Sequence, residues 1–581
     1  MKFNKVNWNT AYEWLSEKQE LLVKAYKKNE MEKVRYLQIS ILKDFRTTAI
    51  AVRRVTTSNS SKTPGLDGLL ATTNEERNEL SLRVHKIVRS PSTYEPLAVK
   101  RVWIPKKDGT KRPLGISSII DRAVQAVYLE IIDPIVECTA CRNSFGFRKY
   151  RSAQDAVLVL RGKLYHPKAS DWVLNADIAK CFDRINHDFL LRSVPVYRKV
   201  DCNVLKKMLK AKVIDMRDVI YPDMGTPQGS VLSPILCNVA LNGLEEAVKN
   251  KAIELRRSVL KRGGNPKVHV VRYADDFIVI GPSKKMLVAL RPCIDDFLAE
   301  RGLEISKAKS SLFNIWEQDI EFLGFSFRKR RFNYKKRFEV SWNKRSYKSP
   351  SRIIIRPSID NLRKFKSKVR AIIRSHTDLH TLVLKLNEYL CGWANYFALT
   401  GDSAKCVRDL HRFVLWACWR KVVKLYPVMP RKQIRKRFFP SHKFYQLGRY
   451  VNRAWVFSVP TKLERPSVQD AKLRLYNLDS IKAPGKATAP IGLNAYIKED
   501  TIKLERRKTR VTIPSGRVEK ICIRQNFICP ACGQSLGNGE DIEVHHTPSL
   551  KTMRLHPSPN KQVKLVALHK LCHSRVHSKE T

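Results

Sequence analysis

The sequence is poor in acidic residues relative to basic ones. Asp and Glu together number 54 against 110 Lys and Arg, so the 581-residue chain carries a formal charge of +56. A basic excess of this size repels itself unless a polyanion lies nearby, which makes nucleic acid the expected partner. Binding through many phosphate contacts should weaken steeply as salt is added.

Long apolar runs are also missing. The longest uncharged stretch, residues 224–244, contains Pro227 and Pro234 and is typical of a packed loop and helix rather than a membrane span. The first 20 residues lack the apolar core of a secretory signal. Lys, Asn and Ser taken together outnumber Ala and Gly taken together, as in AT-rich genomes. We therefore expect no membrane partner and a location in the bacterial cytoplasm or the matrix of a mitochondrion or chloroplast.

Cysteine is scattered singly through most of the chain and gathers only near its end. The last 60 residues hold 4 of the 13 Cys and 6 of the 14 His. Isolated thiols fit a reducing compartment, and the terminal enrichment indicates one small module built around a metal. The sequence has no internal repeats and no long low-complexity tract.

Local patterns predict a chain of mixed α and β structure. Helical spacing over residues 1–55 predicts two helices. From residue 99 to about 327, short β-rich runs alternate with helical ones, and HVVRYADDFIVIG (269–281) is predicted as a hairpin. Residues 360–426 return to helical periodicity, with a basic face beside an apolar stripe. Residues 458–515 carry Pro and Gly at irregular spacing and are predicted to be an extended connector.

Two adjacent acids, Asp275 and Asp276, interrupt the β-rich run VRYADDFIVIG. Neighbouring residues on a strand point to opposite faces, so the pair can meet one site only where the chain turns. Such a concentration of charge predicts bound Mg²⁺, and phosphoryl transfer uses two such ions roughly 3.5–4 Å apart. A third carboxylate should come from a neighbouring strand. Asp177, at the end of the apolar stretch LNAD, is the best candidate.

Eight motifs stand in order along the chain, and together they resemble the set carried by reverse transcriptases encoded within group II introns. They are TPGLDG (63–68), IPKKDGTKRPLGI (104–116), SFGFRKYRSAQDA (144–156), NADIAKCFDRINH (175–187), GTPQGSVLSPIL (225–236), YADD (273–276), GLEISKAKS (302–310) and FLGF (322–325). The resemblance implies a multidomain α+β protein with a right-hand fingers and palm polymerase fold. It also implies a helical thumb or maturase domain, a basic DNA-binding region and a small ββα-metal HNH domain. The implied domains are 1–98, an N-terminal helical extension and start of the fingers; 99–345, fingers and palm; 346–426, thumb; 427–515, DNA-binding region and linker; and 516–581, HNH domain.

The same resemblance assigns roles in the polymerase site. Asp177, Asp275 and Asp276 would hold two Mg²⁺ ions, assisted by the backbone carbonyl of Ile178. The residues that would surround the incoming dNTP are Lys106 and Arg112, which would grip its triphosphate, Phe182, which would exclude a ribose 2′-hydroxyl, and Gln228, which would line the pocket.

The spacing of the terminal Cys and His residues predicts a structural Zn²⁺ site. A C-x2-C pair followed by an H-x2-C pair supplies four ligands of tetrahedral type, namely Cys529, Cys532, His569 and Cys572. His573 and His577 are separated by four residues, as on one face of a helix. They are left to face a different ion.

With IEVHHTP (542–548) between the two pairs, this layout resembles the HNH endonucleases that end many group II intron proteins. The resemblance implies that His545, His573 and His577 hold a divalent ion, Mg²⁺ or similar, and that His546 is the general base that activates water. Lys564 stands where the family usually has Asn, so we expect slowed or absent cleavage with an intact zinc fold. The alternative is a purely structural zinc knuckle.

These features predict an RNA-directed DNA polymerase that assists the splicing of its intron RNA and nicks the second strand of target DNA. The expected partners are the intron RNA, the target DNA and dNTPs. One alternative is a non-catalytic RNA-binding splicing factor, against which the complete set of three acids and PQG argues. Another is a reverse transcriptase of a different lineage, such as a CRISPR-associated or diversity-generating one, against which TPGLDG and the terminal module argue.

Overall fold

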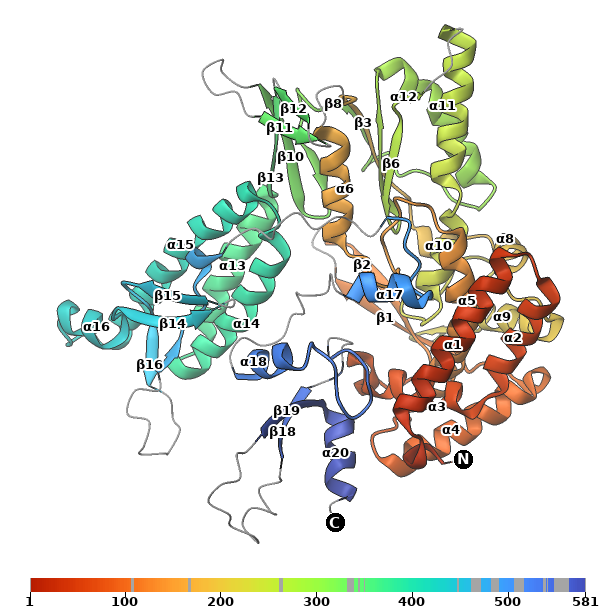
Figure 1. Ribbon diagram of the computed structural model, residues 1–581, viewed down its shortest axis with the longest axis horizontal. Helices are drawn as coiled ribbons and strands as arrows, with labels where there is room; N and C mark the ends of the chain where they lie inside the picture. Colours follow the sequence, from red (N-terminus) through yellow and green to blue (C-terminus); the bar gives the residue numbers. More distant parts are fainter. Residues whose placement is uncertain are drawn as a thin grey trace.

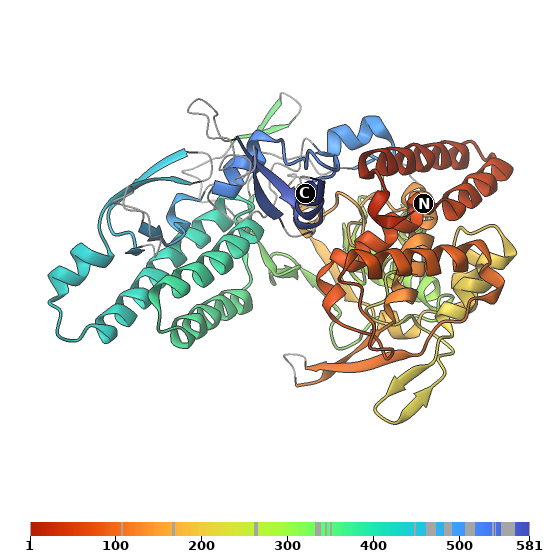
Figure 2. The ribbon, with the colours of Figure 1, turned by 90° about the horizontal axis from the view of Figure 1, so that it is seen from below.

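A computed structural model describes most of the chain (Figure 1). The described residues are 2–105, 109–165, 169–260, 265–331, 339–342, 345–348, 351–446, 449–460, 472–481, 491–505, 517–536, 540, 542–547 and 564–579. Helices α13–α16 lie on one side of the molecule, and the N-terminal helices lie on the other. The C-terminal helix α20 returns to lie near those N-terminal helices in both views (Figures 1 and 2). Within the described residues, the search for a membrane-spanning helix finds none of sufficient length and apolarity.

The N-terminal domain is a cluster of helices. They are η1 (Phe3–Lys5), α1 (Trp8–Lys27), α2 (Met31–Lys43), α3 (Phe45–Thr57), η2 (Asn59–Lys62), α4 (Asn74–Arg89) and η3 (Pro91–Thr93). The prediction of two helices in the first 55 residues is wrong, because Asp44 starts a third. Its backbone is extended and its carboxylate accepts a hydrogen bond from the Arg46 N–H, so it ends α2 and caps α3.

Two four-stranded sheets follow. The outer sheet has the order β2-β1-β4-β5 and consists of β1 (Val99–Pro105), β2 (Lys111–Ile116), β4 (Val213–Asp215) and β5 (Asp218–Ile220). The central sheet has the order β6-β7-β3-β8 and consists of β3 (Trp172–Asp177), β6 (His269–Tyr273), β7 (Asp276–Gly281) and β8 (Ser311–Asn314). All pairings in the central sheet are antiparallel, and the predicted hairpin at 269–281 is confirmed.

Helices are interspersed among these strands along the chain, and α6, α11 and α12 among them pack directly on the central sheet. They are α5 (Ile119–Thr139), α6 (Ala153–Tyr165), α7 (Cys181–Arg184), α8 (His187–Ser193), α9 (Lys199–Leu209), α10 (Ser233–Leu241), α11 (Leu244–Leu260) and α12 (Lys284–Ala299). The run of uncharged residues at 224–244 forms the loop before α10 and α10 itself, as its composition predicts. Every residue of α10 except Pro234 is buried, which explains why this helix carries no charge.

A third sheet connects the central sheet to three long helices. Its order is β13-β10-β9, with β9 (Ile320–Phe322), β10 (Phe325–Arg331) and β13 (Ser351–Pro357), and the hairpin β11 (Glu339–Trp342) and β12 (Arg345–Lys348) lies between β10 and β13 in sequence. The helices are α13 (Ile359–Ser375), α14 (Leu379–Phe397) and α15 (Gly401–Leu425). The predicted helical character of residues 360–426 is confirmed. The apolar stripe of α15 is buried at Val407, Leu410, Val414, Cys418 and Val422.

The last part of the chain consists of short elements. They are α16 (Arg431–Phe438), β14 (His442–Gln446), β15 (Arg449–Arg453), β16 (Ser458–Pro460), β17 (Lys472–Arg474), η4 (Leu478–Ser480), α17 (Lys498–Glu505), α18 (Arg517–Arg524), β18 (Ile542–Thr547), β19 (Lys564–His569) and α20 (Lys570–Lys579).

The prediction of an extended connector at 458–515 is wrong for the parts that the structure describes. The backbone N–H of Tyr476 donates to Asn387 on α14, and the Tyr496 ring is buried near Asp133 on α5. The connector therefore packs at one end on the three-helix unit, formed by α13, α14 and α15. At the other end it packs on the N-terminal half of the chain.

Candidate active site

The three predicted acids meet at one edge of the central sheet. In the β6–β7 hairpin Tyr273 pairs with Asp276, so only Ala274 and Asp275 form the loop. Asp276 pairs in turn with Asp177 on β3. The Ile178 N–H donates to the Asp275 carbonyl at 3.3 Å, which ties the end of β3 to the loop. The turn thus brings together carboxylates that lie about a hundred residues apart in sequence.

These carboxylates repel one another electrostatically. Burial and the neighbouring charges of Asp177 and Asp275 raise the pKa of Asp276 to about 7. Burial, and then Asp177, also raise the pKa of Asp275, against the opposing effects of Arg112 and Lys309. Clustered carboxylates of this kind are stabilised in the ionised form by bound cations. The Lys309 ammonium already provides one positive charge here, because its Nζ lies 2.9 Å from Asp177 Oδ2. Oxygen donors alone also match the preference of Mg²⁺.

A cavity of about 710 Å³ opens beside the acids. Its lining includes six residues that the sequence singled out, namely Arg112, Asp177, Ile178, Phe182, Gln228 and Asp275. Asp276 is not among the described lining residues, although it pairs with Asp177 on the neighbouring strand. Lys106 lies outside the described residues. Lys309 also lines the cavity, and the sequence did not single it out, although it lies in the motif GLEISKAKS.

The loop that carries Gln228 is fixed to the strand that carries Arg112. The Gly115 N–H on β2 donates to the Gln228 carbonyl at 2.6 Å, and Gln228 Nε2 donates to Asp183 Oδ1 at 3.0 Å. Gly229 adopts φ +112°, and a Cβ there would lie 2.8 Å from the Gly115 carbonyl oxygen. Only glycine allows this close approach, so Gly229 lets the two sides of the cavity lie together.

Arg272, a residue that the sequence did not single out, stabilises the β6–β7 turn that carries Asp275. Its guanidinium is buried and donates to the Ala274 carbonyl, Asn238 Oδ1 and Asn242 Oδ1, each at 3.2 Å. Ala274 adopts φ +56°, which is unfavourable for a residue with a Cβ. Arg272 therefore fixes a strained turn by binding its carbonyl.

Replacing Arg272 by Met is expected to destabilise the fold and lower catalysis together. Methionine fills similar space but leaves buried acceptors without a donor, at a cost of roughly 1–3 kcal/mol for each. Thermal unfolding should shift to lower temperature, and cDNA synthesis should fall even at temperatures where the variant is folded. Unchanged activity in a folded variant would show that the turn does not need this support.

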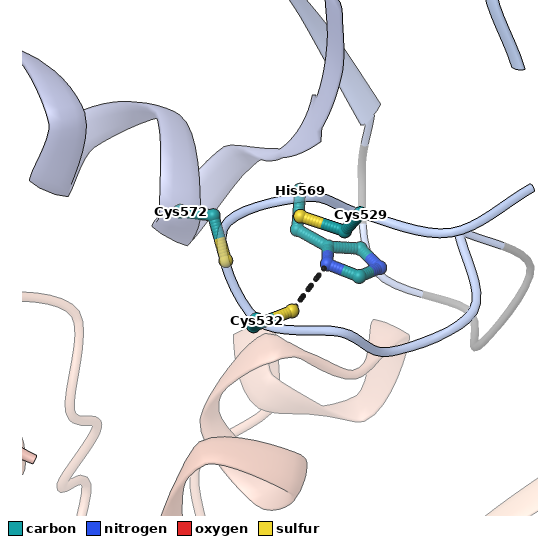
Figure 3. Close-up of side chains that lie close together, drawn as sticks. All are labelled: Cys529, Cys532, His569 and Cys572. Atoms are coloured by element: carbon teal, nitrogen blue, oxygen red, sulfur yellow. Dashed lines mark hydrogen bonds between the residues drawn. The ribbon is translucent and has the colours of Figure 1, made fainter. Parts of the chain in front are cut away.

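The four predicted zinc ligands lie together at the other end of the chain (Figure 3). Cys529 and Cys532 belong to a loop, His569 ends β19, and Cys572 lies in the first turn of α20. All four are buried, and their ligand atoms lie within 4.8 Å of one another. His569 Nε2 lies 3.2 Å from the Ser535 carbonyl, which leaves Nδ1 facing the sulfurs. Three sulfurs and one imidazole nitrogen match a tetrahedral zinc site.

The structure brings together two of the residues predicted to hold the second ion. The rings of His545, on β18, and His573, on α20, have centroids 5.4 Å apart. His573 Nδ1 lies 2.7 Å from Glu543, a partner that the sequence did not single out. Glu543 and His545 are two residues apart on one strand and so share a face, a signal that was available in IEVHH. His546 lies on β18 opposite Leu565 and Lys564 lies opposite Thr547. The side chains of His546, Lys564 and His577 lie outside the described residues.

Three acids gather at the end of an antiparallel sheet, beside a cavity with a cation and a glycine-supported loop, and this arrangement fits a nucleic-acid polymerase of the palm type. Family models match the chain in three places: the reverse transcriptase (RNA-dependent DNA polymerase) at residues 104–327, the N-terminal domain of reverse transcriptase at 3–84, and the group II intron maturase-specific domain at 362–439. The chain belongs to the reverse transcriptase family, and it is a group II intron reverse transcriptase and maturase. This part of the sequence-based prediction is confirmed.

Curated relatives agree with this assignment. Protein YkfC of Escherichia coli is 32% identical over 264 residues, which cover 41% of this chain and 69% of YkfC. A COX1/OXI3 intron 2 protein of Saccharomyces cerevisiae is 23% identical over 94% of this chain and 67% of its own length. Group II intron-encoded protein LtrA of Lactococcus lactis is 27% identical over 59% of this chain and 67% of LtrA. The chain therefore spans about two thirds of each of these relatives.

Proposed function

We propose that the protein copies RNA into DNA at the cavity beside Asp177 and Asp275. The observation that carries this proposal is the convergence of three carboxylates where β3 ends and the β6–β7 hairpin turns. Two of them, Asp177 and Asp275, line a cavity that also presents Arg112 and Phe182. The residues that would hold Mg²⁺ are Asp177, Asp275, Asp276 and the Ile178 carbonyl. When bound, the two ions would align the primer 3′-hydroxyl with the α-phosphate and neutralise the departing pyrophosphate.

The remaining residues of the cavity would position the nucleotide. Arg112 is exposed on β2 and would bind the triphosphate through its fork of donors. Phe182 is half-buried and lies against the Phe147 ring, edge to face, with centroids 6.2 Å apart. A ring held this way is rigid enough to reject a ribose 2′-hydroxyl by contact.

Replacing Phe182 by Ala is therefore expected to relax the choice of sugar. The ratio of kcat/KM for dNTP to that for rNTP should fall at least about tenfold, equivalent to about 1.4 kcal/mol of discrimination. Primer extension on an RNA template with each nucleotide measures it. Phe189→Ala, which also removes a ring but on α8 away from the cavity lining, is the matched control and should keep the wild-type ratio. An unchanged ratio in Phe182→Ala would assign the sugar choice to another residue.

We also propose that the chain binds its intron RNA and assists splicing through α13–α15. On α13 the apolar residues Phe365, Val369, Ile372 and Ile373 are buried, while the basic residues of the other face are exposed, namely Arg363, Lys366, Lys368, Arg370 and Arg374. A rigid basic face of this kind fits a phosphate backbone. The maturase-specific match over residues 362–439 supports the same partner.

The third proposed activity is nicking of target DNA by the C-terminal module. The pairing of β18 with β19, followed by α20, supports an HNH-type arrangement, and the proximity of His545 and His573 supports a divalent ion site there. Zn²⁺ would be held separately by Cys529, Cys532, His569 and Cys572. His546 would act as the general base.

The endonuclease proposal predicts opposite effects for two substitutions. His546→Ala should abolish nicking of target DNA by the ribonucleoprotein, whereas Lys564→Asn, which restores the usual family residue, should raise it. Both are measured with end-labelled target DNA at a fixed Mg²⁺ concentration. If neither the wild type nor Lys564→Asn cleaves DNA while both retain zinc, the module is a structural zinc knuckle.

A further inference from the structure

The N-terminal helices contribute one more group to the Cys/His cluster, the guanidinium of Arg53 on α3. Its side chain has 0% exposed surface. Nη2 donates to Cys572 Sγ at 3.3 Å and to Cys532 Sγ at 3.8 Å. Nε and Nη2 also donate to Glu540 at 3.2 and 3.1 Å, respectively. The two sulfurs and Glu540 all belong to the C-terminal module, so one side chain connects the two ends of the chain.

Helix α1 holds Arg53 in this position. The guanidinium carbon lies 4.8 Å from the centre of the Trp8 ring and 5.9 Å from that of Tyr12. Gly533, next to Cys532, lies so close to α1 that a Cβ there would be 2.8 Å from Asn9 Oδ1. Figure 3 shows this N-terminal part of the chain, in pale red, directly beside the cluster. The contact is therefore a packed interface.

The interface is also continuous with the main hydrophobic core. Residues of the C-terminal module belong to the same buried cluster as residues of α1, α2 and α3: Ile521, Cys522, Cys529, Cys532, Leu536, Ala567, Leu568 and Cys572. A module attached only by a flexible linker would not share a core with the domain at the opposite end of the sequence.

The charge balance gives Arg53 a chemical role. Zn²⁺ bound by three thiolates and a neutral imidazole carries a net charge of −1, and a buried anion is costly unless an opposite charge compensates it. Arg53 provides a permanent positive charge and N–H donors to two of the three sulfurs. Hydrogen bonds to charged acceptors are stronger than neutral ones, and partners that contact metal ligands change metal affinity by roughly 10- to 100-fold.

We propose that Arg53 completes the metal centre from the N-terminal domain, so that metal binding and docking of residues 517–579 on α1 and α3 are coupled. This inference rests on the proposed zinc site. Coupling is reciprocal: the factor by which docking strengthens metal binding is the factor by which the metal strengthens docking. The ion thereby fixes the position of residues 517–579, the C-terminal module, relative to the part of the chain that carries the polymerase site.

The test measures zinc affinity and interface protection in the full-length protein. Arg53→Met keeps the length of the side chain and removes its charge and donors. Competition with a chromophoric chelator should give a zinc affinity roughly 10- to 100-fold weaker than wild type. Arg53→Lys keeps the charge but loses the planar set of N–H donors, so its zinc affinity should lie between those of the wild type and Arg53→Met. Arg35→Met is the matched control, because Arg35 is exposed on α2 and its guanidinium pairs with Glu32 on the same helix, 3.2 Å away. The zinc affinity of this variant should stay at the wild-type value.

Hydrogen exchange gives a readout that does not depend on activity. Removing zinc from the wild type should raise exchange in peptides covering α1 and α3, and addition of zinc should restore protection. Unchanged exchange on chelation, or wild-type zinc affinity in Arg53→Met, would overturn the coupling. Absence of stoichiometric zinc in the wild type would instead refute the metal site itself. Should Arg53→Met prove misfolded, Arg53→Lys, which keeps the buried charge and loses donors, provides the comparison in a folded protein, and its zinc affinity should still be weaker than that of the wild type.

Discussion

Replacing both Asp275 and Asp276 by Asn should reduce cDNA synthesis to roughly one thousandth of the wild-type rate or less. The carboxylates are proposed to hold ions that stabilise the transition state by several kcal/mol, and about 4 kcal/mol corresponds to a thousandfold change in rate. Asparagine has nearly the same shape as aspartate, so the β6–β7 turn should keep its geometry. Relief of the repulsion among the three acids should leave the fold as stable as the wild type or more stable, because burial and the neighbouring charges oppose ionisation of both groups.

The same variant separates polymerisation from splicing. Primer extension on an RNA template measures the first, and splicing of the intron transcript at near-physiological salt measures the second. Splicing should persist, because the basic face of α13 is untouched. Asp295→Asn is the matched control, since Asp295 is half-exposed on α12, pairs with Arg291 and is not among the described cavity-lining residues. Wild-type cDNA synthesis in the double variant would show that polymerisation does not depend on these two carboxylates and would refute their assignment to the catalytic site.

The central sheet could be predicted because its signals are local. Continuous runs of apolar, mostly β-branched residues define β6 and β7. Two adjacent acids between them are tolerated only where a hairpin turns or a strand edge faces a site. The ordered motifs placed Asp177 in the same site, and its pairing with Asp276 agrees with that expectation. One detail differs: Asp276 already belongs to β7, so the tip of the turn is Ala274 and Asp275.

Residues that act through long-range contacts left no such signal. A single Arg in the strand HVVRY gives no sign that its guanidinium turns back to bind Asn238, Asn242 and the Ala274 carbonyl. In the same way, Arg53 lies in an ordinary amphipathic helix, and its partners are 479 and 519 residues away. Local spacing cannot encode contacts of that separation.

The contacts of the connector, residues 458–515, were also not predictable from local sequence. Pro and Gly in residues 458–515 indicate where regular structure is interrupted, but they carry no information on what the intervening apolar residues contact. Leu475, Tyr476 and Leu478 are buried against the three-helix unit, and Tyr496 packs near α5. The Arg151 guanidinium donates to the Leu493 carbonyl at 2.6 Å, which fixes this second attachment. A segment that reads as a spacer therefore links the three-helix unit to the polymerase half.

Replacing Cys572 by Ser should remove the zinc ion and unfold the C-terminal module while polymerisation continues. Structural zinc sites contribute roughly 10–16 kcal/mol of apparent binding free energy at pH 7, which in small modules is folding free energy. The described parts of residues 517–579 form short helices and one two-stranded sheet, so their fold depends on the metal site and on the core that they share with the N-terminal helices. Zinc affinity, measured by competition with a chelator, should fall at least about tenfold, equivalent to about 1.4 kcal/mol. Limited proteolysis should then cleave this region first.

Cys522 offers a closely matched control for that experiment. It is as buried as Cys572 and lies in the same module on α18, but it is not a member of the four-residue cluster. Cys522→Ser should therefore retain zinc and resist proteolysis, apart from the modest cost of a buried hydroxyl. Equal zinc loss in the two variants would mean that general destabilisation, rather than loss of a ligand, explains the effect. The polymerase site lies on a separate sheet, so cDNA synthesis should survive in both variants. Nicking of target DNA should be lost only in Cys572→Ser, because Cys572 lies at the start of α20, next to His573.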